Sequence, residues 1–592
     1  MPGATSRRFP AHTSNEDRVR IRPASLLPLA LVAACSSGPA VQPAPSAAGI
    51  PATWNLTGKS RVAEGGSAMV VSGSPIASEV GRDILRRGGN AVDAAVAVGF
   101  ALAVVHPEAG NIGGGGFMVI RLKDGTTQTL DYRETAPGRA TRDMYLDANG
   151  QPTEKSITGH LAAGVPGSPA GLVEAHHRFG KLPFSDVIAP AIRLANEGFV
   201  VDSHRFRSIN GDRERLAQFE ASRASFLPNG AAPVPGSTMV QRDLGRTLEA
   251  IRDSGAAGFY RGRVADLIVA EMQRGGGLIS KEDLAAYRAI WRDPVRISYR
   301  GYTIFSMPPA SSGGVTMAEI LNIMEGYKPL PPFGSAELVH REAEAMRRAF
   351  TDRNRELGDP AFVQMPLDRL LSKDYAATLR SQIGERASKT AAFDPSVPTG
   401  SSTTHYSVVD ADGNAVSTTT TLNNSYGSAV TVAGGGFLLN DEMDDFATAP
   451  GKPNMFGLVQ GDANAVAPGK RMLSAMTPSI VLDPKGQLYM VVGTPGGPRI
   501  ITMVYHVISN VIDHHMSLPD AVAAPRMHHQ ALPDRISMER GGFAPAVLAD
   551  LKARGHQVAE GGRGGDVEAI IRHGHGWEGV SDPRSGGGGA GY

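Results

Sequence analysis

The sequence predicts an α+β protein whose strands lie between helical layers, a four-layer α/β/β/α sandwich. Helical patterns fill the N-terminal part and most of the segment 179–394. Strand patterns dominate from Thr403 onward and are followed by a helix near 502–512. The chain has 592 residues, of which 41% are hydrophobic, and can therefore bury the large core that such layers need.

The N-terminal elements follow from local signals. Asn90 is a typical N-cap for a helix over 91–105. That helix is apolar on nearly every side, so we expect it to be buried. The other elements expected here are a helix and three strands: 78–87, 67–72, 117–122 and 128–132.

The middle of the chain, 179–394, is expected to be mostly helical, with the clearest segments at 317–325 and 336–353. Near the C-terminus, 586–589 is a run of glycines of low complexity that we expect to be loose.

A threonine-rich hairpin begins at Thr403. Asp412-Gly413-Asn414 is a turn signal between two strand patterns. A loop symmetric about Asp412 places Thr421 opposite Thr403, so that two hydroxyls face each other at the open end. The alternative is a hairpin with a structural role only, because threonine favours strands.

A threonine hydroxyl becomes a useful nucleophile only when a base takes its proton. The one nearby side chain of that kind is His405. A second solution is to cut the chain before the threonine and to use the freed α-amine, which titrates near 8.

Further motifs occur in order on both sides of the hairpin: Gly88-Gly89-Asn90-Ala91-Val92-Asp93-Ala94-Ala95, Asn111-Ile112-Gly113-Gly114-Gly115-Gly116-Phe117, Asp131-Tyr132-Arg133-Glu134, Gly164-Val165-Pro166-Gly167-Ser168, Pro308-Pro309-Ala310-Ser311-Ser312-Gly313-Gly314, Asp441-Glu442-Met443-Asp444-Asp445-Phe446, Pro495-Gly496-Gly497 and Ser581-Asp582-Pro583-Arg584. Together with the segment 403–427 they resemble the γ-glutamyltranspeptidase family. The resemblance runs from about residue 60 to the C-terminus.

This resemblance implies the N-terminal-nucleophile hydrolase form of the sandwich. It also implies a γ-glutamyltransferase and glutathione hydrolase that works without a cofactor. The precursor would cut itself between Ser402 and Thr403, giving a large subunit (60–402) and a small subunit (403–592) that form a heterodimer. Glutathione and other γ-glutamyl compounds would be donors, and water, amino acids or peptides would accept the acyl group.

The resemblance also assigns roles in the site. Arg133 would bind the substrate α-carboxylate and Asp445 its ammonium, whereas a surface arginine and a solvated acidic loop are the plain alternatives. Thr421 would position the nucleophile. Asn423 and Glu442 would help Asp445 to bind the ammonium, and Ser474 would bind the carboxylate. Gly496 and Gly497 would donate to the oxyanion, and Phe456 would lie in a lid over 449–457.

Two positions depart from the family pattern. Ala475 stands where family members have a second serine, and this removes one donor. Losing a hydrogen bond to a charged group costs roughly 1.5–3 kcal/mol. Phe456 occupies a position often held by tyrosine, and it lacks the hydroxyl that could latch the lid.

The N-terminus has the pattern of an export signal. Residues 1–35 contain an apolar run, 24–34, of signal-peptide length, followed by Cys35 in a sequence that resembles a lipobox. Residues 36–59 read as a tether. We therefore expect a periplasmic protein held at the outer membrane by a lipid on Cys35. That cysteine is the only one in the chain, so no internal disulfide is possible.

Other functions are less well supported. A formal net charge of +1 does not suggest nucleic-acid binding. The pairs His514-His515 and His528-His529 lack metal-ligand spacing, so no metal is expected. Three alternatives stay open: an acylase of the same fold acting on glutaryl or cephalosporin-type amides, an unprocessed lipoprotein that only binds γ-glutamyl compounds, and a general peptidase.

Overall fold

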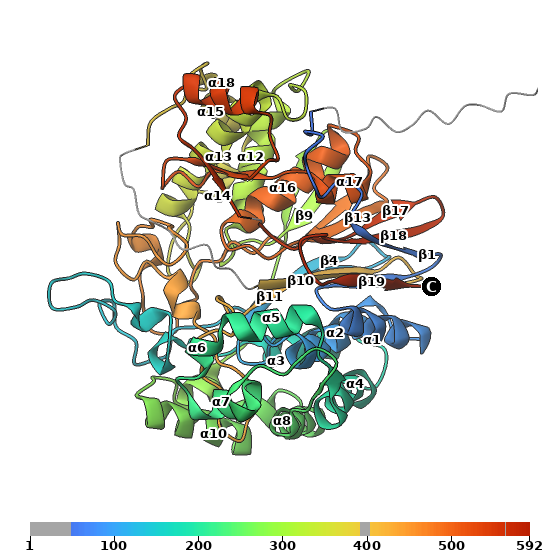
Figure 1. Ribbon diagram of the computed structural model, residues 1–592, viewed down its shortest axis with the longest axis vertical. Coiled ribbons are helices and arrows are strands. Elements are labelled where there is room, and N and C mark those ends of the chain that lie inside the picture. Colours follow the sequence, from blue (N-terminus) through green and yellow to red (C-terminus); the bar gives the residue numbers. More distant parts are fainter. Residues whose placement is uncertain (1–48, 391–402, 563) are drawn as a thin grey trace, which may run out of the picture. The chain divides into compact units, whose positions relative to one another are not determined.

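The structure is a computed structural model that describes residues 49–390, 403–562 and 564–592. Within these residues, two seven-stranded antiparallel sheets pack against each other, with helices on both outer sides (Figure 1). The first sheet has the order β1 (Arg61–Gly65), β18 (Gly576–Ser581), β17 (Glu568–His573), β13 (Leu488–Gly493), β12 (Ser479–Leu482), β9 (Tyr302–Ser306), β8 (Val295–Tyr299). The second has the order β19 (Gly588–Gly591), β2 (Met69–Ser72), β10 (Thr403–Val409), β11 (Ala415–Thr421), β3 (Gly115–Arg121), β4 (Thr127–Asp131), β7 (Ile290–Arg292).

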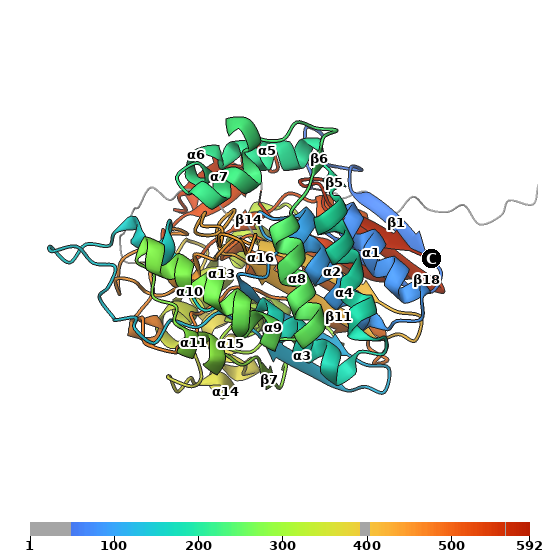
Figure 2. The same ribbon diagram turned by 90° about the horizontal axis from the view of Figure 1, so that it is seen from below.

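Two helical layers enclose the sheets. On the outer side of the second sheet lie α1 (Pro75–Arg86), α2 (Ala91–Val105), α3 (Ser168–Phe179), α4 (Phe184–Glu197) and α8 (Arg242–Ser254). Figure 2 shows α2, α4 and α8 side by side. The first sheet is covered by α12 (Gly313–Glu325) and α16 (Arg499–Ile512), and α13 (Ala336–Glu356) packs against α12.

The structure also contains α5 (Ser203–Gly211), α6 (Arg213–Leu216), α7 (Glu220–Phe226), α9 (Ala257–Tyr260), α10 (Gly262–Gly275), α11 (Lys281–Ala286), α14 (Leu367–Leu370), α15 (Lys373–Ser381), α17 (Leu518–Ala523), α18 (Pro545–Ala553), β5 (Phe199–Val200) and β6 (Thr238–Met239). A three-stranded sheet of β14 (Met527–His528), β15 (Ile536–Glu539) and β16 (Val558–Gly561) lies beside α16.

Helix α2 has the predicted bounds and the predicted burial. Every one of its residues is buried. Asn90 Oδ1 accepts hydrogen bonds from the N–H groups of Val92 and Asp93, at 3.0 and 2.9 Å, and Asp93 accepts from the Asn90 N–H at 2.9 Å. This reciprocal capping box satisfies N–H groups that the first helical turn leaves without partners.

The β10–β11 hairpin has the predicted register, with Thr403 opposite Thr421. Side chains alternate along a strand. Ser407 donates to the carbonyl of Glu568 in the first sheet, whereas Tyr406 approaches Gly99 of α2. Thr403 shares the odd-numbered face with Ser407, so its hydroxyl points into the space between the sheets.

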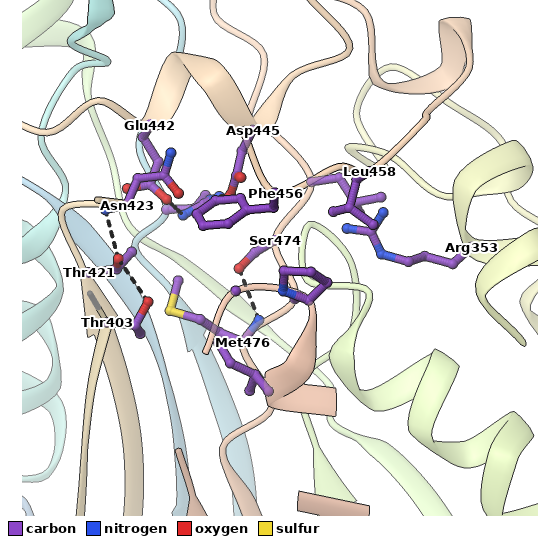
Figure 3. A pocket seen from close by; sticks show the side chains of 16 residues that line it. Arg353, Thr403, Thr421, Asn423, Glu442, Asp445, Phe456, Leu458, Ser474 and Met476 are labelled. Carbon is purple, nitrogen blue, oxygen red and sulfur yellow. Dashed lines mark hydrogen bonds and ion pairs between the residues drawn. The ribbon is translucent and has the colours of Figure 1, made fainter. Parts of the chain in front are cut away.

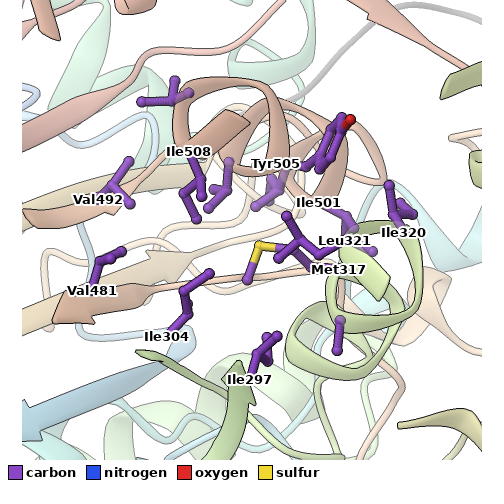
Figure 4. Packing of buried hydrophobic residues seen from close by; sticks show 14 of the residues in the cluster. Ile297, Ile304, Met317, Ile320, Leu321, Val481, Val492, Ile501, Tyr505 and Ile508 are labelled. Carbon is purple, nitrogen blue, oxygen red and sulfur yellow. The ribbon is translucent and has the colours of Figure 1, made fainter. Parts of the chain in front are cut away.

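The apolar layer between the first sheet and its helices anchors α16 (Figure 4). Buried side chains from β9, β12 and β13 pack against α12 and α16: Ile304, Val481, Val492, Met317, Leu321, Ile501 and Ile508. Because this packing fixes the helix, it also fixes the glycine turn that precedes the first residue of α16.

The region 179–394 is mostly helical, as predicted, but the short strands β5 to β9 also lie within it. Strand β8 buries Val295, Ile297 and Tyr299 and exposes the residues between them, an alternation that is visible in the sequence but short.

The glycine run 586–589 is not loose. Its second half enters β19, which pairs with β2 at the edge of the second sheet. A Cβ atom at Gly587 would lie 2.2 Å from Glu568 Oε1, and one at Gly589 would lie 2.9 Å from Ala63 Cβ. The glycines are therefore sites of close packing.

No helix among the described residues is long and apolar enough to cross a membrane.

Candidate active site

One pocket collects most of the residues that the sequence singles out (Figure 3). It is lined by Arg133, Thr403, Thr421, Asn423, Glu442, Asp445, Phe456, Ser474, Ala475 and Gly497, together with Arg353, Leu458, Leu473, Met476, Pro498 and Ile500. Gly496 is next to this wall in sequence but does not line it. The cavity volume is only about 20 Å³, which is room for about one water molecule. The pocket therefore holds little free volume.

Thr403 and Thr421 meet at the open end of the hairpin. Their Oγ1 atoms lie 3.1 Å apart, and either hydroxyl can donate. The N–H of Asn423, whose φ is 80°, donates to Thr421 Oγ1 at 2.7 Å. With this N–H accepted on one lone pair, Thr421 can direct its proton toward Thr403 Oγ1. Such a contact positions the Thr403 oxygen and stabilises negative charge on it.

His405 does not serve Thr403 as a base. Its Nδ1 is 2.8 Å from Thr419 Oγ1, and its Nε2 is 3.1 Å from Ser407 Oγ. Burial lowers the pKa of His405 to about 3, so the ring is neutral. Both ring nitrogens therefore form hydrogen bonds to hydroxyl groups of β10 and β11, and neither contacts Thr403.

Arg133 lies at the centre of a buried charge cluster. Its Nη1 contacts Glu442 and its Nη2 contacts Asp445, while Nε donates to the Met472 carbonyl at 3.2 Å. Arg133 is 0% exposed and Glu442 is 1% exposed, which excludes a surface arginine and a solvated acidic loop. Each Nη carries a second proton, so the guanidinium can still donate to a bound carboxylate.

Carboxylate groups outnumber cations around Arg133. Glu134 lies behind it, with 3.6 Å between Arg133 Nη1 and Glu134 Oε2. Among the described residues, neither oxygen of Glu134 nor Oε2 of Glu442 has a hydrogen-bond partner. Burial raises the pKa of Glu134 to about 7 and also raises the pKa values of Glu442 and Asp445. Buried acceptors without donors are costly. An ammonium group in the pocket would supply the missing donors to Glu442.

Ser474 and Ala475 form the wall across the pocket. Ser474 Oγ accepts from the N–H of Met476 at 3.1 Å, which leaves its proton for another acceptor. Ala475 is 8% exposed and lines the pocket. The missing hydroxyl therefore leaves a methyl group where a donor could face the substrate.

The glycine turn precedes α16. Gly496 and Gly497 have φ values of 148° and 56°, a region that favours glycine. Among the described residues, no acceptor is found for the N–H groups of Gly496 and Gly497. Gly497 lines the pocket beside Thr403, so its N–H is a candidate donor to an oxyanion formed there.

In the described ranges no group of three or more histidine, cysteine, aspartate or glutamate side chains is arranged to hold a metal ion.

Comparison with known proteins assigns the family. The gamma-glutamyltranspeptidase family model matches residues 77–592. The chain belongs to the γ-glutamyltranspeptidase family. A glutathione hydrolase proenzyme of Escherichia coli (strain K12) is 47% identical over 525 residues, which cover 87% of this chain and 90% of that protein.

Two solved structures support the fold of this family member. The cephalosporin acylase from Bacillus halodurans has a TM-score of 0.79 at 29% identity and covers 90% of this chain and 97% of that one. Helicobacter pylori gamma-glutamyltranspeptidase has a TM-score of 0.52 at 46% identity and covers 52% of this chain and 90% of that one. The four-layer sandwich of the N-terminal-nucleophile hydrolase type is confirmed.

The segment 449–457, the candidate lid, contributes Phe456 to the pocket wall, and its backbone is held without a tyrosine hydroxyl. Asp444 Oδ2 accepts from the Met455 N–H at 3.0 Å, and Gln530 Nε2 donates to the Phe456 carbonyl at 3.1 Å. The Phe456 ring lies against Gly497, where an added Cβ would be 3.1 Å from it. The Phe456 ring thus takes up part of the space that a substrate would need.

Sequence reasoning missed Arg353, a buried side chain of α13 that lines the pocket. Its Nε donates to Ser312 Oγ at 3.0 Å, and Ser312 Oγ donates to the Ser474 carbonyl at 2.6 Å. Its Nη1 donates to Gln460 Oε1 at 3.1 Å, and Gln460 donates to the Asp445 carbonyl, also at 3.1 Å. Arg353 therefore supports the walls that carry Ser474 and Asp445. Only an arginine in a helical pattern was visible in the sequence.

Two predicted positions lie outside the described residues: Ser402, the residue before the expected cleavage, and Cys35, the expected lipidation site.

Proposed function

We propose that this enzyme is a γ-glutamyltransferase and glutathione hydrolase whose nucleophile is Thr403. The observation that carries the proposal is that one pocket contains both the Thr403–Thr421 hydroxyl pair and the acid-rich cluster around Arg133. The first can form an acyl-enzyme. The second has the charges that a zwitterionic glutamyl head group requires.

The acyl transfer begins with attack of Thr403 Oγ1 on the γ-carbonyl. The free α-amine of Thr403 takes the hydroxyl proton, since its pKa lies near 8. Thr421 holds the attacking oxygen, and the N–H groups of the glycine turn stabilise the oxyanion. The amine then returns the proton to the departing nitrogen. Water or an amino-acid or peptide amine next attacks the γ-glutamyl ester and regenerates Thr403.

The substrate's α-carboxylate and α-ammonium groups are bound by the pocket residues that do not take part in acyl transfer. Arg133 and Ser474 donate to the α-carboxylate, and Asp445 and Glu442 accept from the α-ammonium, with Asn423 held beside them by a 3.0 Å bond to the Asp441 carbonyl. Glu442 Oε2 without a partner favours a substrate that brings an ammonium group. This favours γ-glutamyl over glutaryl compounds, and glutathione is the donor we propose.

Self-cleavage before Thr403 supplies the amine that this chemistry needs. The matched Escherichia coli relative is named a proenzyme, and the matched Helicobacter pylori chain corresponds to about half of this chain. Both facts support a precursor that becomes a large and a small subunit, and we propose the boundary between residues 402 and 403 because Thr403 is the proposed nucleophile.

The proposed function is tested by a pair of substrates that differ only in the ammonium group. We expect the processed enzyme to hydrolyse a γ-glutamyl anilide with a kcat/KM at least roughly tenfold above that for the glutaryl anilide, the effect of one charge-assisted hydrogen bond. A preference for the glutaryl anilide would establish the acylase alternative instead. Cleavage of ordinary α-peptides at a similar rate would establish a general peptidase.

Ala475→Ser is expected to lower KM for the γ-glutamyl anilide by roughly tenfold, because the new hydroxyl can donate to the substrate carboxylate. Steady-state kinetics measures this change. Ala475→Val adds bulk without a donor and serves as the matched control. If valine lowers KM as much as serine, then wall packing and not hydrogen bonding is responsible.

We also propose that the enzyme is exported and held at the periplasmic face of the outer membrane by a lipid on Cys35. The support is the sequence of residues 1–35 alone. Mass spectrometry of the mature N-terminus tests the proposal, and an unacylated N-terminus would contradict it.

A further inference from the structure

A second cavity lies on the other face of the first turn of α16. Pro498 and Ile500 line the substrate pocket, whereas Arg499 and Met503 line the second cavity. Its opposite wall is the three-stranded sheet of β14, β15 and β16. The cavity volume is about 120 Å³. An engineered cavity of about 150 Å³ binds benzene, so this one has room for a small organic molecule.

Two arginines on the wall of this cavity have no ion-pair or hydrogen-bond partner in the part of the chain that the structure describes. Within the described residues, the guanidinium groups of Arg499 and Arg535 make no ion pair or hydrogen bond, and the Nε of Arg535 is buried without an acceptor. Burial lowers the pKa of Arg499, the Glu539 carboxylate raises it, and the positive charge of Arg535 lowers it by a smaller amount. The two like charges thus lie close enough to repel each other.

One acid, Glu539, also lines the cavity, and both Glu539 and the neighbouring Asp582 are already paired with other arginines. Glu539 accepts from Arg584 Nε and Nη2 at 2.7 and 2.6 Å, and Asp582 accepts from Arg526 Nη2 at 2.6 Å. Arg526 also lines the cavity, is 4% exposed, and has an Nε with no partner among the described residues. These pairs cancel one another, so the cavity keeps the charges of Arg499 and Arg535 and a buried unpaired donor. Such a site attracts an anion.

The apolar part of the wall indicates what kind of anion fits. Met503, Met527 and Met538 are all buried and line the cavity. Methionine side chains adapt to irregular carbon groups. Guanidinium groups match the planar carboxylate group with paired hydrogen bonds. An inorganic oxyanion would satisfy the arginines but would leave the methionine wall unfilled.

We propose that this cavity binds a small organic carboxylate, with its carboxylate between Arg499 and Arg535 and its carbon chain against the three methionines. The site is distinct from the substrate pocket and does not depend on the reaction assigned to it. Because Arg499 follows the glycine turn by two residues, a ligand here contacts the helix end that positions Gly497.

Binding is tested on the processed enzyme with methyl-¹³C-methionine NMR and calorimetry, using butyrate as the probe. We expect saturable binding of butyrate that shifts the methyl signals of Met503, Met527 and Met538. Met476 lines the substrate pocket and reports on that pocket separately. Uncharged butyramide should not bind, and phosphate should bind more weakly than butyrate. Equal binding of butyramide, tighter binding of phosphate, or a shift of Met476 alone would each overturn the proposal.

Arg535→Gln should weaken butyrate binding by roughly tenfold or more, the effect of losing one charge-assisted hydrogen bond. The matched control is Arg540→Gln, which removes the same charge from an exposed residue just beyond β15. Equal loss in both variants would show a nonspecific charge effect and contradict the site. Should Arg535→Gln fail to fold, the comparison of butyrate with butyramide on the unaltered enzyme still decides the question.

Discussion

Replacing Thr403 with alanine is expected to leave the chain as one full-length band on a denaturing gel and to remove its activity. The unaltered protein should give two bands, corresponding to residues 403–592 and to the part that precedes them. The same hydroxyl is needed twice, first to attack the carbonyl before it and later to attack the substrate. For enzymes whose nucleophile is removed, kcat falls by a factor on the order of 10⁶.

Thr403→Ser is the matched control, because it keeps the hydroxyl and removes only a methyl group. It should give two bands and measurable activity. The strand pairing of β10 does not depend on the side chain, so Thr403→Ala should still fold and keep its thermal transition. Two bands from the alanine variant would rule out cleavage by Thr403. One inactive band from freshly made unaltered protein would support the alternative of an unprocessed binding protein.

Local signals were enough for the elements that depend on neighbours in sequence. The turn at 412–414 fixes which threonines face each other, and Asn90 with Asp93 fixes the start of α2. Strand β8 was missed although it alternates, because a run of five residues carries little periodic signal and its pairing with β9 becomes evident only in the sheet. The glycine run 586–589 was misjudged because the close approach of Glu568 to Gly587 and of Ala63 to Gly589 involves distant parts of the chain.

In the site, too, the sequence indicated some residues, whereas others became evident only from contacts between distant parts of the chain. The resemblance picked out Arg133, Glu442 and Asp445, and the structure places them in one buried cluster. That the acids contact the arginine itself, with Glu134 behind it, could not be deduced from spacing. Arg353 had no signal, because its importance lies in reaching Ser312 and Gln460 across the pocket wall. Residues that act by supporting others are visible only when the partners are in place.

Asp445→Asn is expected to raise KM for a γ-glutamyl anilide by roughly tenfold to a hundredfold, the equivalent of about 1.5–3 kcal/mol for a hydrogen bond to a charged group. Asparagine keeps the size and one acceptor oxygen but loses the negative charge that faces the substrate ammonium. The change in kcat should be small, because Thr403, Thr421 and the glycine turn are untouched. Steady-state kinetics with γ-glutamyl and glutaryl anilides measures both effects.

The glutaryl substrate makes this prediction specific, since it has no ammonium group for Asp445 to bind. Its KM should stay constant or fall in Asp445→Asn, and the preference for γ-glutamyl over glutaryl should shrink accordingly. Asp462→Asn is the control, because Asp462 has the same charge and its side chain is 78% exposed beyond the lid. Arg133 keeps its contact with Glu442 in the variant, so the buried guanidinium still has a carboxylate as its ion-pair partner. An equal loss with both anilides would mean that Asp445 only holds Arg133 in place, and recognition of the ammonium would then fall to Glu442.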